Sequence, residues 1–396
     1  MTDQLMQDAQ ELRGSVLDLA GRLIKVPSRG GIDDYGPVLA VMEDWLSAHD
    51  LPSGRLVGAD GSAVGLLCVL EGDVSGPTWV LDACLDTAPV GDRETWSFPV
   101  TAGDVKDGWL RGRGAADSKS GAAIFAHVAA GLRAERDRLC GRLALLFDVD
   151  EHTGGFGGAL AAFTGPHALT DVAGVMIGYP GADELVIGGR GVLRATVTTF
   201  GVAAHSGSRH AAPNAVVKAA DLIRAVSMAQ LPDESDFPVP PKLTVVRVEG
   251  GAGFSVVPDT CQIGIDIRLT ESFDAGAAEK LLYEAVQRLD TDWPDTRPCD
   301  VEVVTSWPAY RLDPVDQPVG AILAGARRVG LAPTPKVAGP SNIGNLLAGL
   351  GIPATCGFGL PYEGLHGANE RVQVDSVPQI HAAYAHAVRM LLAAQD

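Results

Sequence analysis

The sequence predicts an α/β protein in which a mixed-sheet domain is interrupted by an inserted ferredoxin-like domain. Three observations support this prediction. Helix and strand patterns alternate over residues 1–188, amphipathic strands dominate residues 189–305, and the alternation resumes over residues 306–396. Alternating helices and strands are typical of a parallel or mixed sheet with helices on both faces. We therefore expect one outer domain in two parts, with a second domain between them.

The first part of the outer domain, residues 1–188, is divided into elements by the period of its apolar residues. A Gly-rich loop comes before the predicted helix at 118–134. The predicted helices lie at 5–25, 35–50, 118–134 and 157–164, and the predicted strands at 63–70, 78–84, 142–148 and 172–178.

The inserted segment, residues 189–305, follows a β-α-β-β-α-β order. The stretch "GVLRATVTTFGVAAH" alternates as a half-buried strand, and "PKLTVVRVEGGAGFSVVPDTCQIGIDIRLT" predicts two antiparallel strands joined by a Gly-rich turn. Helices at 213–229 and 275–290 and a strand at 300–305 complete the ferredoxin-like pattern. Beyond it, we expect a helix at 316–329, a loop at 338–345 and a closing helix at 375–394.

The composition excludes several classes of partner. There are 31 basic and 49 acidic side chains, which give a formal net charge of −18. A strongly acidic surface repels phosphate backbones and anionic lipid, so we expect no nucleic-acid or membrane partner. No window approaches the roughly 18 apolar residues of a membrane span. Six cysteines are scattered without a CxxC pair, which favours reduced thiols and a cytosolic protein.

Acidic, imidazole and thiol groups recur where strands of the outer domain are predicted to end. They are Cys84 and Asp86 in "LDACLDTAPVGD", Asp117 in "GRGAADSKSG", Glu151 and His152 in "DVDEHTGG", and His366 in "EGLHGANE". Each has a plain structural interpretation, since Asp117 could cap a helix, His152 could be a core histidine and Cys84 a buried thiol. Together, two imidazoles and a carboxylate form a three-ligand zinc shell, and Glu151 can serve as proton acceptor beside it.

The order of these segments, with "GVAAHSG", "GFSVVPDTCQIGIDIRL" and "GFGLPYEGLHGANERV", resembles the zinc amidohydrolases that include acetylornithine deacetylase, succinyl-diaminopimelate desuccinylase, aminoacylase and glutamate carboxypeptidase. The resemblance extends over about residues 10–392, and "GRGAADSK" is its most specific part. It implies an α/β catalytic domain interrupted by a ferredoxin-like lid that often dimerises. It also implies a bridging aspartate between two zinc ions, which falls on Asp117.

Three positions depart from the pattern of these enzymes. The histidine of their HxD motif is Cys84, the second glutamate of their DEE motif is His152, and their Glu-Pro carboxylate aligns with Tyr179. Histidine is a good zinc ligand, whereas a phenol with an unperturbed pKa of about 10 is a poor one. We therefore expect one zinc ion on Asp117, His152 and His366, and a degraded second position unless Asp183 or Glu184 replaces the missing carboxylate.

The resemblance also implies roles for other residues. Asp86 would orient the first ligand, Glu151 would be the general base, and His205 would reach across a dimer of lids to stabilise the oxyanion. Arg268 and Asn214 match positions that bind a substrate carboxylate or the oxyanion, and Arg190 is a weaker match. A homodimer formed through the lid is the expected assembly.

The expected function is a metal-dependent amidohydrolase, a deacylase or peptidase-like enzyme, with Glu151 as general base. It would remove an acyl group from a small N-acylated amino acid, or cleave a peptide-like bond in a dipeptide-like substrate that carries a carboxylate. Two alternatives stay open. One is a repurposed acyl transferase or amide-forming enzyme acting through Cys84, and the other is a metal-free binding protein. Cys84 itself could be a thiolate ligand, an inert buried thiol or a nucleophile.

Overall fold

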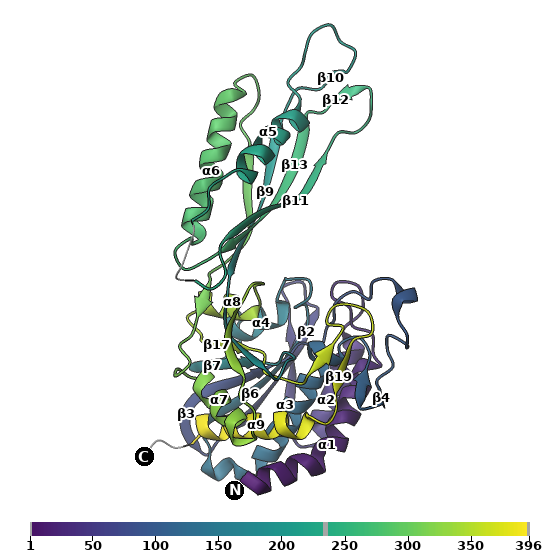
Figure 1. Cartoon of the computed structure of the whole chain (residues 1–396), viewed down its shortest axis with the longest axis vertical. Helices are drawn as coiled ribbons and strands as arrows, with labels where there is room; N and C mark the ends of the chain where they lie inside the picture. The colour runs from purple at the N-terminus through teal and green to yellow at the C-terminus, as the bar shows by residue number, and fades with distance from the viewer. Residues whose placement is uncertain (1, 233–236, 394–396) are drawn as a thin grey trace. The chain divides into compact units, whose positions relative to one another are not determined.

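The computed structural model describes residues 2–232 and 237–393, and the chain forms two compact units (Figure 1). The first unit comprises Met1–Ile187, Leu312–Lys336 and Gly351–Asp396, and the second comprises Gly188–Arg311 and Val337–Leu350. Residues 337–350 group with the second unit, whereas the sequence prediction placed them with residues 306–396. The predicted domain limits at residues 188 and 305 stay a prediction.

The first unit is built on a mixed sheet, as predicted. Its strands lie in the order β1-β2-β6-β3-β7-β17-β8. Strand β3 runs parallel to both β6 and β7, β7 runs parallel to β17, and β2 is antiparallel to β6 and β1. The bounds are β1 Ser53–Val57, β2 Ala63–Glu71, β3 Val74–Asp82, β6 Cys140–Asp148, β7 Val172–Ile177, β8 Glu184–Gly189 and β17 Ala354–Cys356.

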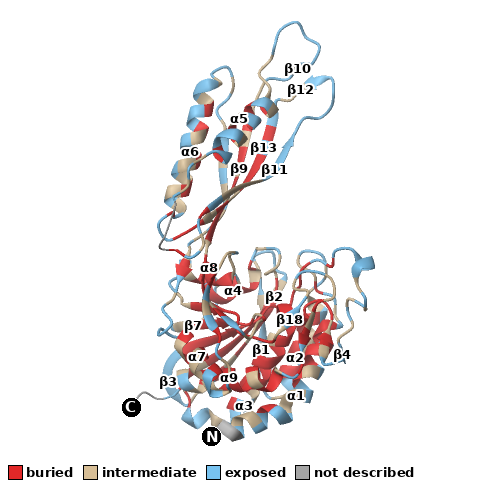
Figure 2. Ribbon diagram, in the orientation of Figure 1, coloured by how far each residue is buried: buried red, intermediate tan, exposed pale blue. Residues whose placement is uncertain are grey.

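Helices pack on this sheet and on one another. Helix α9 contacts α1, α3 and α7, α1 also contacts α3, and α4 packs on β2 and β6. Most of β6 and the last five residues of β3 are buried because both faces of the sheet are covered there, whereas the first four residues of β3 are exposed. Figure 2 shows that buried residues are concentrated in the sheet and helices of the first unit. The bounds are α1 Thr2–Ile24, α2 Gly36–Ala48, α3 Ser120–Leu132, α4 Gly157–Thr164, α7 Val319–Arg328 and α9 Val377–Leu391, with short helices η1 Arg93–Thr95, η2 Ala115–Lys119 and η3 Arg133–Arg138.

A small antiparallel sheet, absent from the sequence prediction, joins two distant segments of the first unit. Its strand order is β18-β19-β5-β4. The pairing of β19 with β5 brings the turn between β18 and β19 close to the loop that follows β5. The strands have two or three residues each, which is too short for a detectable period. Their bounds are β4 Asp104–Lys106, β5 Trp109–Arg111, β18 Tyr362–Glu363 and β19 Arg371–Gln373.

The second unit has the predicted ferredoxin-like arrangement. Its sheet has the order β14-β9-β13-β11, every pair is antiparallel, and α5 and α6 pack on it. The apolar side chains of β13 are buried toward these helices, whereas β14 alternates between half-buried and exposed residues. The bounds are β9 Gly191–Phe200, β10 Ala204–His205, α5 Ala215–Ser227, β11 Lys242–Gly250, β12 Val256–Val257, β13 Thr260–Leu269, α6 Ala275–Asp292, β14 Asp300–Trp307, β15 Tyr310–Arg311 and α8 Ile343–Gly349, and β16 Thr334–Ala338 lies at the limit of the two units.

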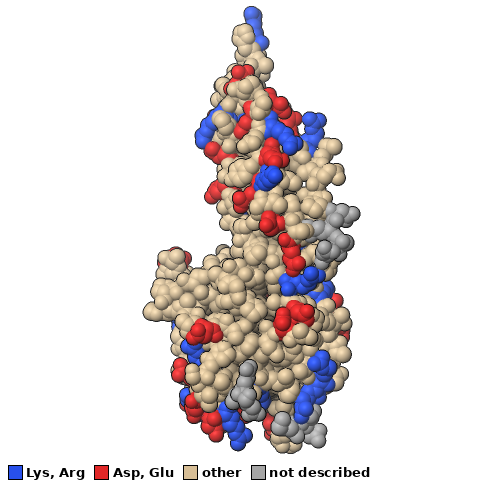
Figure 3. Space-filling view, turned by 90° about the vertical axis from the view of Figure 1, so that its left-hand side faces the viewer, with Lys and Arg blue, Asp and Glu red and all other residues tan. Residues whose placement is uncertain are grey.

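The surface carries charged side chains of both signs, and the cysteines are not paired. Lys and Arg side chains are interspersed with Asp and Glu on the face seen in Figure 3. All six cysteines are free thiols. Among the residues that the structure describes, no helix combines the length and the apolar character needed to cross a membrane.

Candidate metal centre

Two neighbouring strand ends carry most of the predicted site. Strand β3 ends at Asp82, shortly before Cys84 and Asp86, and strand β6 ends at Asp148, shortly before the Glu151–His152 pair. Because β3 and β6 are parallel and adjacent, both loops leave the same edge of the sheet. Ligand-binding groups in α/β proteins gather at this edge.

The small sheet supplies the remaining two donors. Asp117 lies in η2, the turn that follows β5 and leads into α3, and the Asp117–Ser118 peptide bond is cis. His366 lies in the turn between β18 and β19. Its Nε2 is 2.8 Å from Oδ2 of Asp117. Six predicted residues, Cys84, Asp86, Asp117, Glu151, His152 and His366, therefore lie in the same unit, and interactions among their side chains link them.

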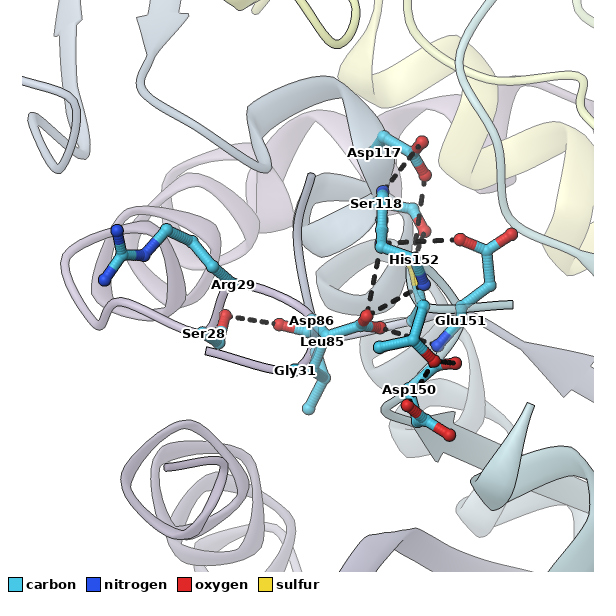
Figure 4. Close-up of polar contacts among 12 residues, drawn as sticks. Ser28, Arg29, Gly31, Leu85, Asp86, Asp117, Ser118, Asp150, Glu151 and His152 are labelled. Atoms are coloured by element: carbon cyan, nitrogen blue, oxygen red, sulfur yellow. Dashed lines mark hydrogen bonds and ion pairs between the residues drawn. The ribbon is translucent and has the colours of Figure 1, made fainter. Parts of the chain in front are cut away.

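The imidazole of His152 lies at the centre of this cluster (Figure 4). Its Nε2 is 3.4 Å from Oδ2 of Asp117, and its Nδ1 is 3.3 Å from Oδ2 of Asp86 and 3.4 Å from Oε2 of Glu151. The side chain is 4% exposed, and among the described residues neither ring nitrogen has a hydrogen bond of good geometry. Both nitrogens are therefore buried beside carboxylates, and Nε2 faces Asp117.

The donor atoms fit a divalent metal ion. Asp117, His152 and His366 each offer one ligand atom, and these atoms lie within 4.8 Å of one another. Two imidazole nitrogens and one carboxylate oxygen are a common donor set for zinc. A carboxylate at the second nitrogen of a ligating histidine is also common, because it fixes the tautomer and the ring orientation.

Asp86 provides that carboxylate. The sequence prediction had Asp86 orient a ligand at position 84. In the structure, its carboxylate accepts hydrogen bonds from the backbone N–H groups of Glu151 at 3.3 Å and His152 at 2.9 Å, in addition to facing Nδ1 of the His152 ring. Asp86 is fully buried. It therefore holds the loop after β6 as well as the ring of His152.

The electrostatics of the cluster depend on burial and on the mixed charges. Burial opposes ionisation of Asp117, but its polar and charge interactions with the imidazoles of His152 and His366 outweigh it and lower the pKa of Asp117 to about 2. Burial also disfavours the charged imidazole of His152, yet Asp117 and Asp86 raise its pKa to about 11. A metal ion at this position must displace the proton that His152 otherwise carries.

Glu151 has the titration behaviour of a proton acceptor that works near neutral pH. Burial, followed by the negative charge of Asp117, raises the pKa of Glu151 to about 7, although the neighbouring His152 lowers it. General bases work best when their pKa lies near the operating pH. The residue is intermediate in exposure, so its carboxylate keeps access to solvent.

Cys84 lies against the same cluster as a neutral thiol. Its Sγ is 3.8 Å from Oδ1 of Asp117 and 3.4 Å from Oγ of Ser118. Burial, together with the negative charges of Asp117 and Glu151, raises the pKa of this thiol well above its ordinary value. Cys84, Glu151 and His152 also form a second set of donors within 4.8 Å of one another, and this set shares His152 with the first.

Tyr179 follows β7 near the same edge. Burial and the charge of Asp117 raise the pKa of its phenol above the ordinary value, so it is neutral. Of the two acids that could have replaced the missing carboxylate, Glu184 forms an ion pair with Lys336 at 2.7 Å. The segment after β7 therefore presents a neutral phenol at the position that the resemblance aligned with a carboxylate.

The remaining predicted residues belong to the second unit, and two of them are arginines. Arg268 donates from Nε and Nη2 to the two carboxylate oxygens of Asp266, at 2.7 and 3.2 Å, and from Nη1 to Oγ of Ser341 at 3.3 Å. Arg190 donates to the carbonyl oxygens of Gly339 and Pro240, at 2.9 and 2.8 Å. Asp266 thus occupies the face of Arg268 that would receive a carboxylate in two parallel hydrogen bonds.

Asn214 and His205 have different local environments. The side chain of Asn214 caps α5 by accepting hydrogen bonds from the N–H groups of Val216 and Val217. His205 is exposed on β10, and its Nδ1 accepts a hydrogen bond from the N–H of Gly207 at 3.0 Å. Asn214 therefore has a structural task that the sequence analysis did not foresee, whereas the Nε2 of His205 has no such task.

Sequence reasoning overlooked four buried charged residues around the site. Arg113 and Glu370 lie within the quoted segments "GRGAADSKSG" and "EGLHGANE" and form a buried ion pair. Asp82 and Asp148 end the two site-bearing strands, and burial raises the pKa of Asp82 to about 8 and that of Asp148 well above its ordinary value. Two sequence signals could have identified three of them. Asp82 and Asp148 each end a largely apolar strand, and Arg113 lies between two glycines.

The fold and this donor cluster define a hydrolytic enzyme of a metal-dependent class. A sequence model of peptidase family M20/M25/M40 matches residues 80–390, and the chain belongs to this family. The resemblance inferred from the motifs is thereby confirmed.

Named relatives are similar over most of the chain. The succinyl-diaminopimelate desuccinylase of Parvibaculum lavamentivorans is 26% identical over 382 residues, which is 94% of each chain. The enzyme of the same name from Cereibacter sphaeroides is 28% identical over 313 residues, which is 76% of this chain and 79% of that one.

Solved structures share the fold. A tripeptidase from Staphylococcus aureus has a TM-score of 0.74 at 18% identity, over 96% of this chain and 98% of that one. A dinuclear metal-binding peptidase of the same family from Bacillus subtilis has a TM-score of 0.71 at 14% identity, over 97% and 99% of the two chains. At these identities the likeness concerns the fold alone.

Proposed function

We propose that this protein is a zinc-dependent amidohydrolase that uses one ion, held by Asp117, His152 and His366. Its substrate would be a small N-acylated amino acid or a dipeptide-like molecule. The observation that carries the proposal is the convergence of these three donors beside Glu151. The desuccinylase relatives support an N-acylated amino acid as the substrate class.

The side chains of this chain would divide the chemistry among them. A divalent ion in this position supplies Lewis acidity and acidifies water. Glu151, whose pKa is about 7 before a metal binds, accepts the proton of the attacking water and returns it to the leaving amine. Asp86 holds Nδ1 of His152, so that Nε2 stays directed at Asp117.

The second unit would supply substrate recognition. We infer that Arg268, assisted by Asn214 and Arg190, binds the substrate carboxylate, which competes with Asp266 for the guanidinium. His205, exposed and with Nε2 uncommitted, would stabilise the oxyanion of the partner subunit in a homodimer. We also propose a cytosolic location, which the six free thiols support.

The two alternative functions receive less support from the site. An acyl transfer through Cys84 needs a thiolate, and the pKa of the Cys84 thiol is raised, not lowered. A metal-free binding protein has no need of two imidazoles and a base around one carboxylate. The donor set is thus better matched to hydrolysis.

The test combines metal content with substrate turnover. Purified protein is expected to contain about one zinc per chain by elemental analysis, and a chelator is expected to abolish amine release. Amine release is measured on N-acetyl, N-succinyl and N-formyl amino acids and on dipeptides. Protein that binds no zinc when saturated with it, or that forms product only with a second organic substrate, would overturn the proposal.

A further inference from the structure

A buried ion pair lies directly behind the metal-binding donors. The side chains of Arg113 and Glu370 are only 4% and 1% exposed, and Nη1 of Arg113 is 2.5 Å from Oε2 of Glu370. The other carboxylate oxygen of Glu370, Oε1, accepts hydrogen bonds from the backbone N–H groups of Ala116 at 2.8 Å and Asp117 at 3.3 Å. Glu370 therefore holds the turn from which the Asp117 carboxylate projects.

The guanidinium of Arg113 holds two other segments. Its Nη2 donates to the carbonyl oxygens of Pro89 at 3.0 Å, His366 at 3.3 Å and Gly367 at 2.9 Å. His366 has a φ of 57°, in the left-handed region that a residue with a side chain rarely adopts. A backbone held there needs support from its surroundings, and Arg113 provides hydrogen bonds to it.

One ion pair thus connects the three backbone segments that surround the donors. Pro89 lies in the loop of Asp86, Ala116 precedes Asp117, and Gly367 follows His366. Arg113 and Glu370 are 257 residues apart in the chain. The pair therefore bridges these three segments by side-chain hydrogen bonds.

We propose that Arg113 and Glu370 are positioning residues, which set the distance between the Asp117 and His366 ligands without touching metal or substrate. This inference rests on the proposed function, because it assumes that those two side chains bind an ion. An ion pair that only stabilised the fold would change the unfolding temperature and leave the metal affinity of the folded protein unchanged. The two roles can therefore be separated.

The test measures zinc affinity by competition with a chromophoric chelator, at a temperature at which circular dichroism shows each variant folded. Glu370→Gln keeps the size of the side chain but replaces one acceptor oxygen by an NH₂ group. In either orientation of the amide, that NH₂ group would face a donor, which is Nη1 of Arg113 in one case and the backbone N–H groups of Ala116 and Asp117 in the other. We expect the zinc affinity to fall about 10- to 100-fold, as for other residues that support metal ligands. The visible spectrum of the Co²⁺-substituted protein is expected to change as well.

Two further variants keep the test decisive. Arg113→Lys retains the positive charge but cannot reach Glu370 and three carbonyl groups at once, so it should weaken zinc binding even if Glu370→Gln does not fold. Glu135→Gln is the matched control, because it removes the carboxylate of another Arg–Glu pair in the same unit, with Arg389 at 2.6 Å. We expect it to bind zinc as the parent does.

The outcomes are distinguishable. Parental zinc affinity and Co²⁺ spectrum in folded Glu370→Gln or Arg113→Lys would overturn the positioning role alone. An equal loss of affinity in Glu135→Gln would also overturn it, because the effect would then be general loosening. If the parent protein bound no zinc, the proposed function would fall first, and this inference with it.

Discussion

The two ring nitrogens of His152 face two different carboxylates, with Asp86 at 3.3 Å from Nδ1 and Asp117 at 3.4 Å from Nε2. Asp86 thus contacts the histidine that the motif resemblance aligned with a glutamate, across two parallel strand ends. A carboxylate behind an imidazole is the usual support of a histidine that binds a metal. The altered residues therefore form a coherent site.

Replacing Asp86 tests this relationship. Asp86→Asn removes the negative charge that faces Nδ1 and presents an NH₂ group or a weaker acceptor to the ring. We expect zinc affinity to fall about 10- to 100-fold. Asp150→Asn is the control, since Asp150 lies on the same loop but bonds to Thr153 and Gly157. Unchanged zinc binding in Asp86→Asn, measured by chelator competition, would contradict the assigned role.

Replacing Glu151 separates proton transfer from metal binding. Glu151→Gln keeps the shape of the side chain and removes its basicity, so kcat for amine release should fall about 10²- to 10⁴-fold. Zinc content should stay as in the parent, because the three proposed ligands are untouched. A variant that retains more than a tenth of the parental kcat would show that another group accepts the proton.

The sequence was sufficient for the large elements and for the location of the site. Most of β6 and the second half of β3 are recognisable because burial on both faces makes them mainly apolar there. The strands β5, β18 and β19 are too short to show a period, so Asp117 and His366 were grouped from their donor chemistry and from the resemblance, not from a predicted strand pairing. The direction of the Asp86 side chain, and the Arg113–Glu370 pair 257 residues apart, depend on tertiary packing that no local pattern encodes.

Cys84 and Tyr179 offer a test of the missing second ion. The double variant Cys84→His, Tyr179→Glu places an imidazole and a carboxylate at the two positions where the motif resemblance implies them. We expect zinc content to rise from about one to about two ions per chain. Cys84→Ser is the matched control, which should keep about one ion and the parental turnover. Loss of turnover in Cys84→Ser would instead favour the nucleophilic role of Cys84.

Two buried histidines of the first unit predict a specific acid sensitivity. His127 and His381 are 3% and 6% exposed, and burial lowers the pKa of each to about 4. Nδ1 of His127 lies 2.7 Å from the carbonyl oxygen of Ala123, and its Nε2 lies 2.9 Å from Oγ of Ser15, an arrangement that suits the neutral ring. Both side chains are therefore neutral in the folded protein at neutral pH.

The sign of the effect follows from proton binding. Between pH 6.5 and 4 the unfolded chain binds protons at these histidines that the folded chain does not, so their contribution to stability falls as the pH falls through this window. Where a histidine is protonated in the unfolded chain and neutral in the folded chain, it changes the free energy of unfolding by about 1.4 kcal/mol per pH unit. Asp82 acts in the opposite direction, because its raised pKa lets the folded state hold a proton up to about pH 8.

Comparing a histidine variant with the parent protein cancels the opposing contribution of Asp82, which both proteins share. His381→Phe deletes one buried histidine and leaves Asp82 unchanged, so its free energy of unfolding relative to the parent should increase steadily as the pH is lowered from 6.5 to 4. Urea unfolding at each pH measures this difference, and His167→Phe, at an exposed histidine, controls for the change of side chain. A difference between His381→Phe and the parent that stays constant over this range would show that His381 is not buried in its neutral form.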